Sequence, residues 1–184
     1  MIHHRTLGTL AATLLVVAVA ALACGTSEPS ARDHVGVPRL RAATDQGPGG
    51  GPFDTSRPTI GNLDPDLLAA LQAAAKDASD DGVGLLVTSG WRSKAHQRRL
   101  FTEAVSKYGS EEEARRYVST PDTSAHVTGD AVDIGPTDAD DWLIQHGDRY
   151  GLCQVFANEI WHFELATTPG GECPQMYADS SERG

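Results

Sequence analysis

Two short stretches of the sequence carry side chains that could bind a metal ion and transfer a proton. SAHVTGDAVD, residues 124–133, holds a histidine and a carboxylate on either side of a glycine turn, and EIWHFEL, residues 159–165, adds a second pair. Zinc in a hydrolase usually has three protein ligands and one position left for water. A separate carboxylate must accept a proton from that water. The sequence therefore predicts a zinc site and its general base from His126, Asp133, His162 and Glu159.

Side-chain alternation along a predicted strand at 131–134 places the first carboxylate. The two branched apolar residues of this strand should face the core, which leaves Asp133 facing a cleft. Glu159 and His162 are three residues apart, so in a fully extended chain they would point to opposite faces. We therefore expect a turn at 157–158 to bring Glu159 to the metal side.

A second strand is predicted at 160–165. Alternation puts His162 and Glu164 on one face of this strand. The other face is predicted to belong to the core and carries Trp161, Phe163 and Leu165. The strand thus turns one metal ligand toward the cleft.

The elements that hold these residues are expected to form an α+β fold, a small antiparallel sheet flanked by helices. Residues typical of N-caps predict four helices that begin after Asp64, Ser93, Ser110 and Thr137. Short apolar runs predict further strands at 83–88 and 152–156. We expect one folded domain at 63–178 and a short tail at 179–184.

The N-terminal third of the sequence is predicted to export the protein and to tether its folded domain. Residues 1–23 combine a basic residue, an apolar run and small residues, as a secretory signal peptide does; a retained anchor is the alternative. The ending Ala-Leu-Ala-Cys resembles a bacterial lipoprotein box, which implies lipidation of Cys24 and a membrane anchor. Residues 24–62 are rich in Gly, Pro and Ser and are predicted to be a disordered tether, of which only Phe53 and Ile60 dock on the domain.

The charge and the cysteine content of the chain limit its possible partners and its redox compartment. The formal net charge of −10 disfavours nucleic acid and anionic lipid headgroups as partners. Cys153 and Cys173 are left as an even pair once Cys24 is assigned to lipid, and in an oxidising compartment such a pair predicts a disulfide. Two free thiols are the alternative.

Three motifs resemble those of the VanY-type D-alanyl-D-alanine carboxypeptidases. SAHVTGDAVD matches the SxHxxGxAxD motif of this family at every fixed position, and EIWH matches its ExWH. SGWRSKAHQ, residues 89–97, is similar to its SGYRSxxxQ, with Trp91 in place of the usual tyrosine. The resemblance covers roughly 63–165 and implies a fold like that of the hedgehog and D-Ala-D-Ala peptidase group.

The resemblance also implies roles for the matching residues. His126, Asp133 and His162 would bind Zn²⁺, and Glu159 would be the catalytic base and acid. Arg92 would hold substrate and stabilise the developing oxyanion, a role that suits the forked donors of a guanidinium. Gln97 and Ser124 would contact substrate.

The expected protein is a monomeric zinc metallocarboxypeptidase that trims peptidoglycan stem peptides, removing terminal D-alanine. It would be secreted across the bacterial cytoplasmic membrane and lipid-anchored on its outer face, at the cell wall. Three related activities stay open: peptidoglycan endopeptidase, L,D-carboxypeptidase and D-Ala-D-Ala dipeptidase. A zinc-stabilised wall-binding module without turnover is the alternative from another class, and the presence of Glu159 disfavours it because a structural zinc needs no base.

Overall fold

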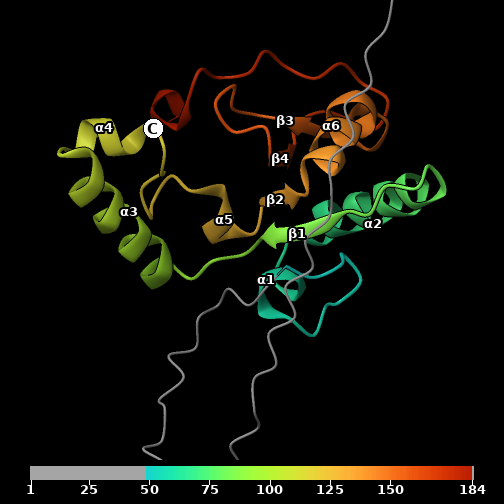
Figure 1. Ribbon diagram of the computed structural model, residues 1–184, viewed down its shortest axis with the longest axis horizontal. Coiled ribbons are helices and arrows are strands. Elements are labelled where there is room, and N and C mark those ends of the chain that lie inside the picture. The colour runs from blue at the N-terminus through green and yellow to red at the C-terminus, as the bar shows by residue number, and fades with distance from the viewer. Residues whose placement is uncertain (1–48, 184) are drawn as a thin grey trace, which may run out of the picture. The chain divides into compact units, whose positions relative to one another are not determined.

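A four-stranded antiparallel sheet frames the part of the chain that this computed structural model describes, residues 49–183 (Figure 1). The strands pair in the order β1-β2-β4-β3. Their bounds are β1 Leu86–Ser89, β2 Ala131–Gly135, β3 Leu152–Gln154 and β4 His162–Leu165. Helices flank this sheet, so the predicted α+β class is confirmed.

The helices begin near the residues that the sequence indicates. The Asp64 side chain accepts hydrogen bonds from two backbone N–H groups at the start of α2, and Ser93 and Ser110 cap α3 and α4 in the same way. The last long helix starts one residue earlier than expected, with Pro136 at its N-cap. The bounds are α1 Pro58–Gly61, α2 Pro65–Asp80, α3 Lys94–Tyr108, α4 Glu111–Arg115, α5 Ala125–Thr128 and α6 Thr137–His146, with 3₁₀ helices η1 Gly147–Tyr150 and η2 Ser180–Arg183.

The hydrophobic core lies between the sheet and the helices α2 and α6. The apolar face of α2 meets the inward side chains of three strands, which bury Val87, Val132 and Phe163 almost completely. α6 adds Trp142 and Leu143 to the same core. Figure 1 shows α3 and α4 on the other side of the molecule from α2 and α6, with α5 between them and β2. The sheet therefore packs against α2 and α6, and α3 to α5 lie where they can form a site.

Residues 49–62 also contact the domain, which the sequence predicted to start at Leu63. Gly50 exchanges two backbone hydrogen bonds with Val87, so this segment pairs with β1. Ile60 is fully buried, as predicted, whereas Phe53 is 54% exposed and does not dock. Backbone pairing with a sheet edge needs no apolar side chains, which is why composition alone placed these residues in the tether.

The C-terminal residues are also part of the domain, contrary to the predicted boundary at residue 178. The Ser180 hydroxyl donates to the Arg115 carbonyl at 2.5 Å, and the Arg116 side chain donates to Asp179 at 3.0 Å. Tyr177 forms a parallel bridge with Phe156. Polar contacts of this kind carry no hydrophobic pattern, so the sequence showed only a Gly/Pro-rich tail.

Cys153 and Cys173 form the predicted disulfide, with their Cα atoms 5.7 Å apart. The bond joins β3 to the C-terminal segment across 20 residues of sequence. The closed loop contains both Glu159 and His162, so the crosslink limits how far the second predicted half of the site can move from the first.

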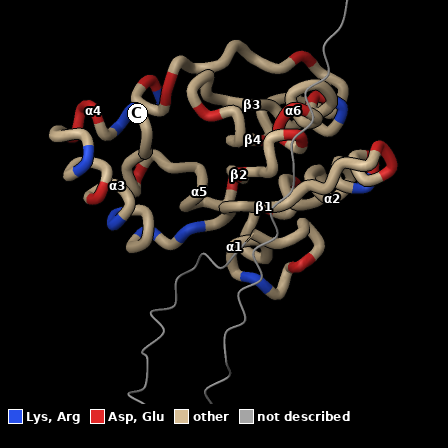
Figure 2. The backbone as a smooth tube through the Cα atoms, in the orientation of Figure 1, with Lys and Arg blue, Asp and Glu red and all other residues tan. Residues whose placement is uncertain are grey.

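The predicted signal peptide, Cys24 and most of the predicted tether lie outside the described residues. Among residues 49–183, no helix is long and apolar enough to cross a membrane. Acidic residues lie on helices and loops throughout this part of the chain, while α3 is rich in basic ones (Figure 2). The basic residues of α3 are Lys94, Arg98, Arg99 and Lys107. The acidic balance of the whole chain is therefore not shared by every element.

Candidate active site

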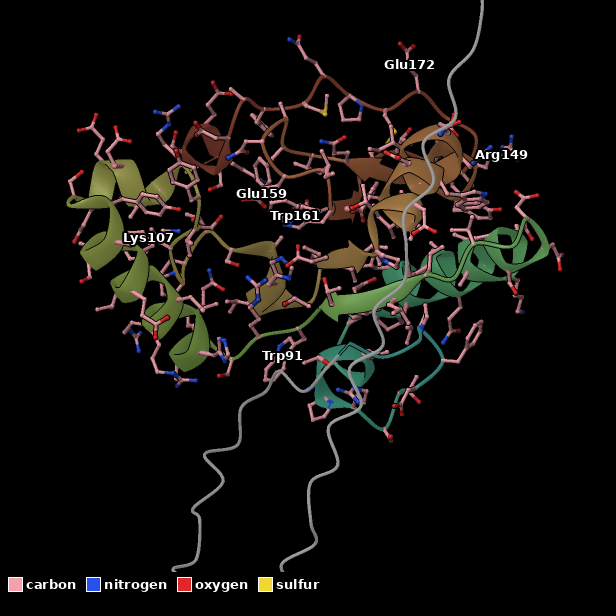
Figure 3. The ribbon with its side chains drawn as sticks, in the orientation of Figure 1. Trp91, Lys107, Arg149, Glu159, Trp161 and Glu172 are labelled. Atoms are coloured by element: carbon pink, nitrogen blue, oxygen red, sulfur yellow. A yellow bond between two sulfur atoms is a disulfide. The ribbon has the colours of Figure 1, made fainter. Side chains whose placement is uncertain are left out.

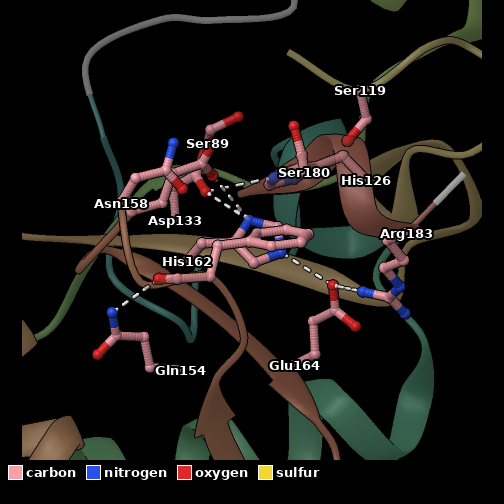
Figure 4. A network of polar contacts seen from close by, with 12 residues as sticks. Ser89, Ser119, His126, Asp133, Gln154, Asn158, His162, Glu164, Ser180 and Arg183 are labelled. Carbon is pink, nitrogen blue, oxygen red and sulfur yellow. Dashed lines mark hydrogen bonds and ion pairs between the residues drawn. The ribbon is translucent and has the colours of Figure 1, made fainter. Parts of the chain in front are cut away.

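The three predicted metal ligands converge on one point. Their ligand atoms all lie within 4.8 Å of one another. Asp133 Oδ1 is 3.2 Å from His126 Nε2 and 3.3 Å from His162 Nδ1 (Figure 4). All three residues are buried. The structure thus brings together one carboxylate and two imidazoles that are 36 residues apart at their extremes.

Strand register and one glycine produce this convergence. Asp133 on β2 is the direct cross-strand partner of His162 on β4, so both side chains project from the same face of the sheet. His126 comes from α5, which ends at Gly129 with φ of +90°. A Cβ at Gly129 would lie 2.6 Å from the Asn62 carbonyl oxygen. Only glycine fits this turn, and the turn leads the chain from His126 into β2.

The donor set fits a zinc ion. The second nitrogen of each imidazole is already occupied: His126 Nδ1 is 2.9 Å from the Gly90 carbonyl, and His162 Nε2 is 2.9 Å from Glu164. Metal-binding histidines characteristically hold their outer nitrogen in this way. The two separations from Asp133 Oδ1 also match the edge of about 3.3 Å that a tetrahedral site with zinc bonds of about 2.0–2.1 Å would have. Two imidazoles and a carboxylate are a common ligand set for catalytic zinc.

The electrostatics of the cluster favour an ionised carboxylate. Burial acts to raise the pKa of Asp133, but His126, His162 and Arg92 outweigh it and hold the pKa below its ordinary value. Burial lowers the pKa of His126. Burial acts in the same direction on His162, but its hydrogen bonds to Asp133 and Glu164 prevail and raise its pKa to about 9. A metal ion held by Nδ1 of His162 would therefore have to displace a proton.

Glu159 reaches the metal side through a turn, as the sequence required. The His162 N–H donates to the Glu159 carbonyl, which closes a turn just before β4. The Glu159 carboxylate is then 3.7 Å from His162 Nδ1. Burial raises the pKa of Glu159 to about 7. A carboxyl group with this position and pKa can accept and return a proton near neutral pH.

Because this turn replaces the first residues of the predicted strand, the core face of that strand was partly misassigned. Phe163 is fully buried, but Trp161 is 43% exposed and Leu165 is 37% exposed. Regular alternation begins only at His162, so Trp161 is free to line the cleft beside Glu159 (Figure 3). The pattern of apolar residues in the sequence does not show the backbone hydrogen bond that closes this turn.

Arg92 is fixed by three side chains. Its Nη2 is 2.7 Å from Asp133 Oδ2, its Nε donates to Ser89, and its Nη1 donates to Gln97. Gln97 is 1% exposed and donates its own amide to the Ser119 carbonyl. Both ends of the Gln97 amide are thus engaged. This arrangement supports a role in orienting Arg92, and Gln97 also lines the cleft, so the substrate contact predicted for it stays a prediction.

A cleft of about 340 Å³ opens from the cluster toward α3 and the segment that follows α4. Arg92, Ser124 and Glu159 line the end nearest the cluster. Ser124 is buried and precedes α5 without capping it through its side chain. The opposite wall was not anticipated from the sequence, and its residues include Leu100, Lys107, Tyr108 and Tyr117. They lie on α3 beyond Gln97 and in the segment after α4, outside the three motifs, so only the fold could assign them to the site.

Glu164 and Arg183 are two further polar residues at this site, and no function was predicted for either of them. Glu164 is 6% exposed and contacts both His162 Nε2 and the Arg183 guanidinium. Alternation did place Glu164 on the face of His162, which is the one signal that could have found it. Arg183 lies in the segment predicted to be a tail.

Comparison with known families agrees with the geometry. Residues 61–167 match the VanY family, described as D-alanyl-D-alanine carboxypeptidase. The match covers more than half of the chain, and the chain belongs to this family. A D-alanyl-D-alanine carboxypeptidase from Enterococcus faecalis (strain ATCC 700802 / V583) is 29% identical over 118 residues, which are 50% of this chain and 44% of that protein. The chain thus matches less than half the length of this relative.

Two solved structures are similar to the described part of the chain. One is the vancomycin resistance D,D-pentapeptidase VanY from a VanB-type cassette in complex with Zn(II), at 26% identity and a TM-score of 0.52, covering 59% of this chain and 73% of that one. The other is the LdcB LD-carboxypeptidase, at 25% identity and a TM-score of 0.50, covering 55% of this chain and 58% of that one.

Proposed function

We propose that this chain is a zinc-dependent peptidase that removes terminal D-alanine from peptidoglycan stem peptides. The convergence of His126, Asp133 and His162 beside Glu159 carries the proposal. A structural metal site needs no proton acceptor at its edge, whereas a hydrolytic one does. The family match and the VanY structure with Zn(II) support the same reaction class.

Each residue has a defined task in this reaction. His126, Asp133 and His162 would hold Zn²⁺, which supplies a Lewis acid and lowers the pKa of water to about 7. Glu159 accepts the proton of the attacking water and returns it to the leaving amine. Arg92 keeps two guanidinium N–H groups beyond its three bonds to the protein, and these can donate to the oxygen that gains charge in the transition state.

The cleft suits the end of a peptide. Arg92 and Ser124 at its closed end offer donors for a terminal carboxylate, and the cleft then continues past Trp161 toward α3. Its volume of about 340 Å³ is within the usual range for small-molecule sites. A stem peptide would enter with its C-terminus at the cluster and its remaining residues along α3 and the segment after α4.

A product assay tests the proposal. The purified chain, loaded with zinc, should release D-alanine from a muramyl-pentapeptide. A chelator should abolish the release, and added zinc should restore it. Mass spectrometry of the products is the measurement. No zinc-dependent cleavage of any stem peptide, together with binding to isolated peptidoglycan, would refute the enzyme and favour a wall-binding module.

The similarity to the LdcB LD-carboxypeptidase supports one second candidate, the removal of D-alanine from a tetrapeptide. Defined pentapeptide, tetrapeptide and crosslinked substrates, supplied separately, distinguish D,D-carboxypeptidase, L,D-carboxypeptidase and endopeptidase activity by product mass. Free D-Ala-D-Ala as substrate identifies a dipeptidase. We expect the pentapeptide to be hydrolysed fastest.

We place the enzyme outside the bacterial cytoplasmic membrane, anchored through Cys24. The lipobox-like ending of the apolar N-terminal run supports this placement. In a bacterial host, Cys24→Ser should move the protein from the membrane fraction to the medium. Incorporation of a labelled fatty acid into the wild type, and not into the variant, would confirm lipidation.

A further inference from the structure

The two nitrogens of His162 face different partners. Nδ1 points to the cluster, 3.3 Å from Asp133 Oδ1 and 3.7 Å from Glu159. Nε2 points the other way, 2.9 Å from Glu164 Oε1 (Figure 4). An ionised carboxylate can only accept a hydrogen bond. The nitrogen beside Glu164 must therefore carry the proton, and a neutral imidazole with its proton there keeps a lone pair on Nδ1 for the metal.

Glu164 is itself held from a distant part of the chain. Its carboxylate is buried in β4 and forms an ion pair with the Arg183 guanidinium, in addition to its bond to His162. An isolated buried carboxylate would be strongly unfavourable, so this pair stabilises the ionised acceptor. Without Arg183, Glu164 would be free to rotate away from the imidazole or to take up a proton.

The segment that carries Arg183 is fixed independently of Glu164. Its backbone pairs with the end of β3 through Tyr177, at 3.0 Å to the Val155 carbonyl and 2.9 Å from the Ala157 N–H. Further along, Asp179 and Ser180 bind α4. Residues 177–183 therefore connect the β3–β4 loop to α4. We call this segment the strap. Arg183 enters the site from its end.

We propose that Glu164 and Arg183 are positioning residues for the metal site. Glu164 selects the imidazole tautomer of His162 that binds the metal through Nδ1, and Arg183, delivered by the strap, holds the Glu164 carboxylate in place. The inference rests on the proposed zinc-dependent function and adds to it two residues that lie outside the three sequence motifs. It also gives the C-terminal segment a task at the site.

Zinc affinity is the direct measurement, made on the full chain by competition with a chromophoric chelator. Removing an outer-shell partner of a zinc-bound histidine typically lowers affinity about 10–100-fold. We expect Glu164→Leu to show a loss in this range. Glu164→Gln keeps an acceptor oxygen and should fall between Glu164→Leu and the wild type. Arg183→Met should lower affinity by roughly tenfold or less, because the acceptor remains but is less well held.

The control variants remove a carboxylate and a guanidinium at positions away from the cleft. Glu172 and Arg149 are exposed and lie away from the cleft (Figure 3). Glu172→Leu and Arg149→Met should leave zinc affinity unchanged. A second readout follows the proton itself: in the zinc-loaded wild type, the Nε2–H of His162 should give a slowly exchanging NMR signal, which is absent from Glu164→Leu and kept in Arg149→Met.

The outcomes separate this inference from the proposed function. Wild-type affinity in Glu164→Leu and Arg183→Met would overturn the positioning role even if stem peptides are cleaved. A chain that binds zinc as described but cleaves no stem peptide would refute the peptidase and leave the positioning role standing. A wild type that binds no zinc would overturn both. If Glu164→Leu fails to fold, Glu164→Gln and Arg183→Met decide.

Discussion

At the scale of single residues, Glu159 differs from its neighbours in having no fixed partner for its proton. The three predicted ligands are locked by hydrogen bonds on their outer atoms, but Glu159 approaches His162 only at 3.7 Å. Burial raises its pKa while it stays 14% exposed to the cleft. A residue that must exchange a proton with substrate needs this combination of a shielded environment and an open side.

Glu159→Gln should therefore separate proton transfer from metal binding. The amide has a similar shape but cannot accept the proton, so we expect the hydrolysis rate to fall about 10²–10⁴-fold. Zinc affinity should stay close to that of the wild type. Steady-state kinetics and chelator competition measure the two effects, and Glu172→Gln is the control for loss of a carboxylate. Full activity in Glu159→Gln would remove this residue from the mechanism.

Asp140 is a second carboxyl group in an unusual environment, this time outside the site. It is 4% exposed, and its Oδ1 has no hydrogen-bond partner among the described residues. Burial, with the nearby charges of Asp141, Asp133 and Asp138, raises its pKa to about 6. The protonated form is therefore favoured in the folded state. Asp140 stabilises the fold fully below its unfolded pKa of about 4, and this contribution is lost as the pH rises through 6.

Asp140→Asn should change how stability depends on pH. We expect the free energy of unfolding of the variant, relative to wild type, to rise by about 1–2 kcal/mol between pH 4 and pH 7, with solvent near Asp141 screening part of the full effect. Urea unfolding at several pH values is the measurement. Asp80→Asn removes the same charge from an exposed site and should show no such rise. A flat difference for Asp140→Asn would contradict the raised pKa.

At the scale of elements, the motifs predicted the ligands because each sits in regular local structure. Asp133 follows from strand alternation, and His126 from its place before a glycine turn. Glu159, Trp161 and the start of β4 depend on one turn whose hydrogen bond is invisible in an apolar pattern. The wall of the cleft formed by α3 and the segment after α4 could not be predicted at all, because it arises from how these parts of the chain pack across from the sheet.

Substituting Gly129 would measure how much the close contact at the end of α5 limits the residues that fit there. Gly109→Ala is a matched control, because Gly109 also has a positive φ, of +87°, but nothing lies within 4 Å of a Cβ there. This control should cost about 1 kcal/mol from backbone strain alone. Gly129→Ala adds the contact with the Asn62 carbonyl, and we expect a loss of about 2–4 kcal/mol together with weaker zinc binding. Equal losses in the two variants would show that this contact is unimportant.

At the scale of the whole molecule, the disulfide and the strap join the C-terminal part of the chain to the sheet. Long-range connections of that part include Cys173 to β3, Ser180 to α4 and Arg183 to β4. The cysteine pair was predictable from compartment and number. The polar connections were not, because surface residues of a Gly/Pro-rich segment give no sign of where they bind.

Removing the disulfide should lower global stability. Cys153 is 2% exposed, so the variant should carry alanine there to avoid a buried hydroxyl, with Cys173→Ser at the more accessible end. The loop of about 20 residues predicts a loss of roughly 3 kcal/mol in the free energy of unfolding. Urea denaturation measures it. Reduced wild type should match the double variant, and a reductant should not change the variant further. Unaltered stability would show that the crosslink adds nothing to the packed loop.

The pairing of β2 with β4 has a consequence for how activity arises during folding. Asp133 and His162 are 29 residues apart and meet only where these two strands join, whereas β3 and β4 can pair through a much shorter connection. Non-local pairings are generally made later than local ones. Before β2 and β4 pair, Asp133 and His162 lie on separate parts of the chain, and neither part forms a complete site. If the chain is the proposed hydrolase, its activity would therefore arise only once β2 and β4 have paired, and an ion bound across these two strands would stabilise their pairing.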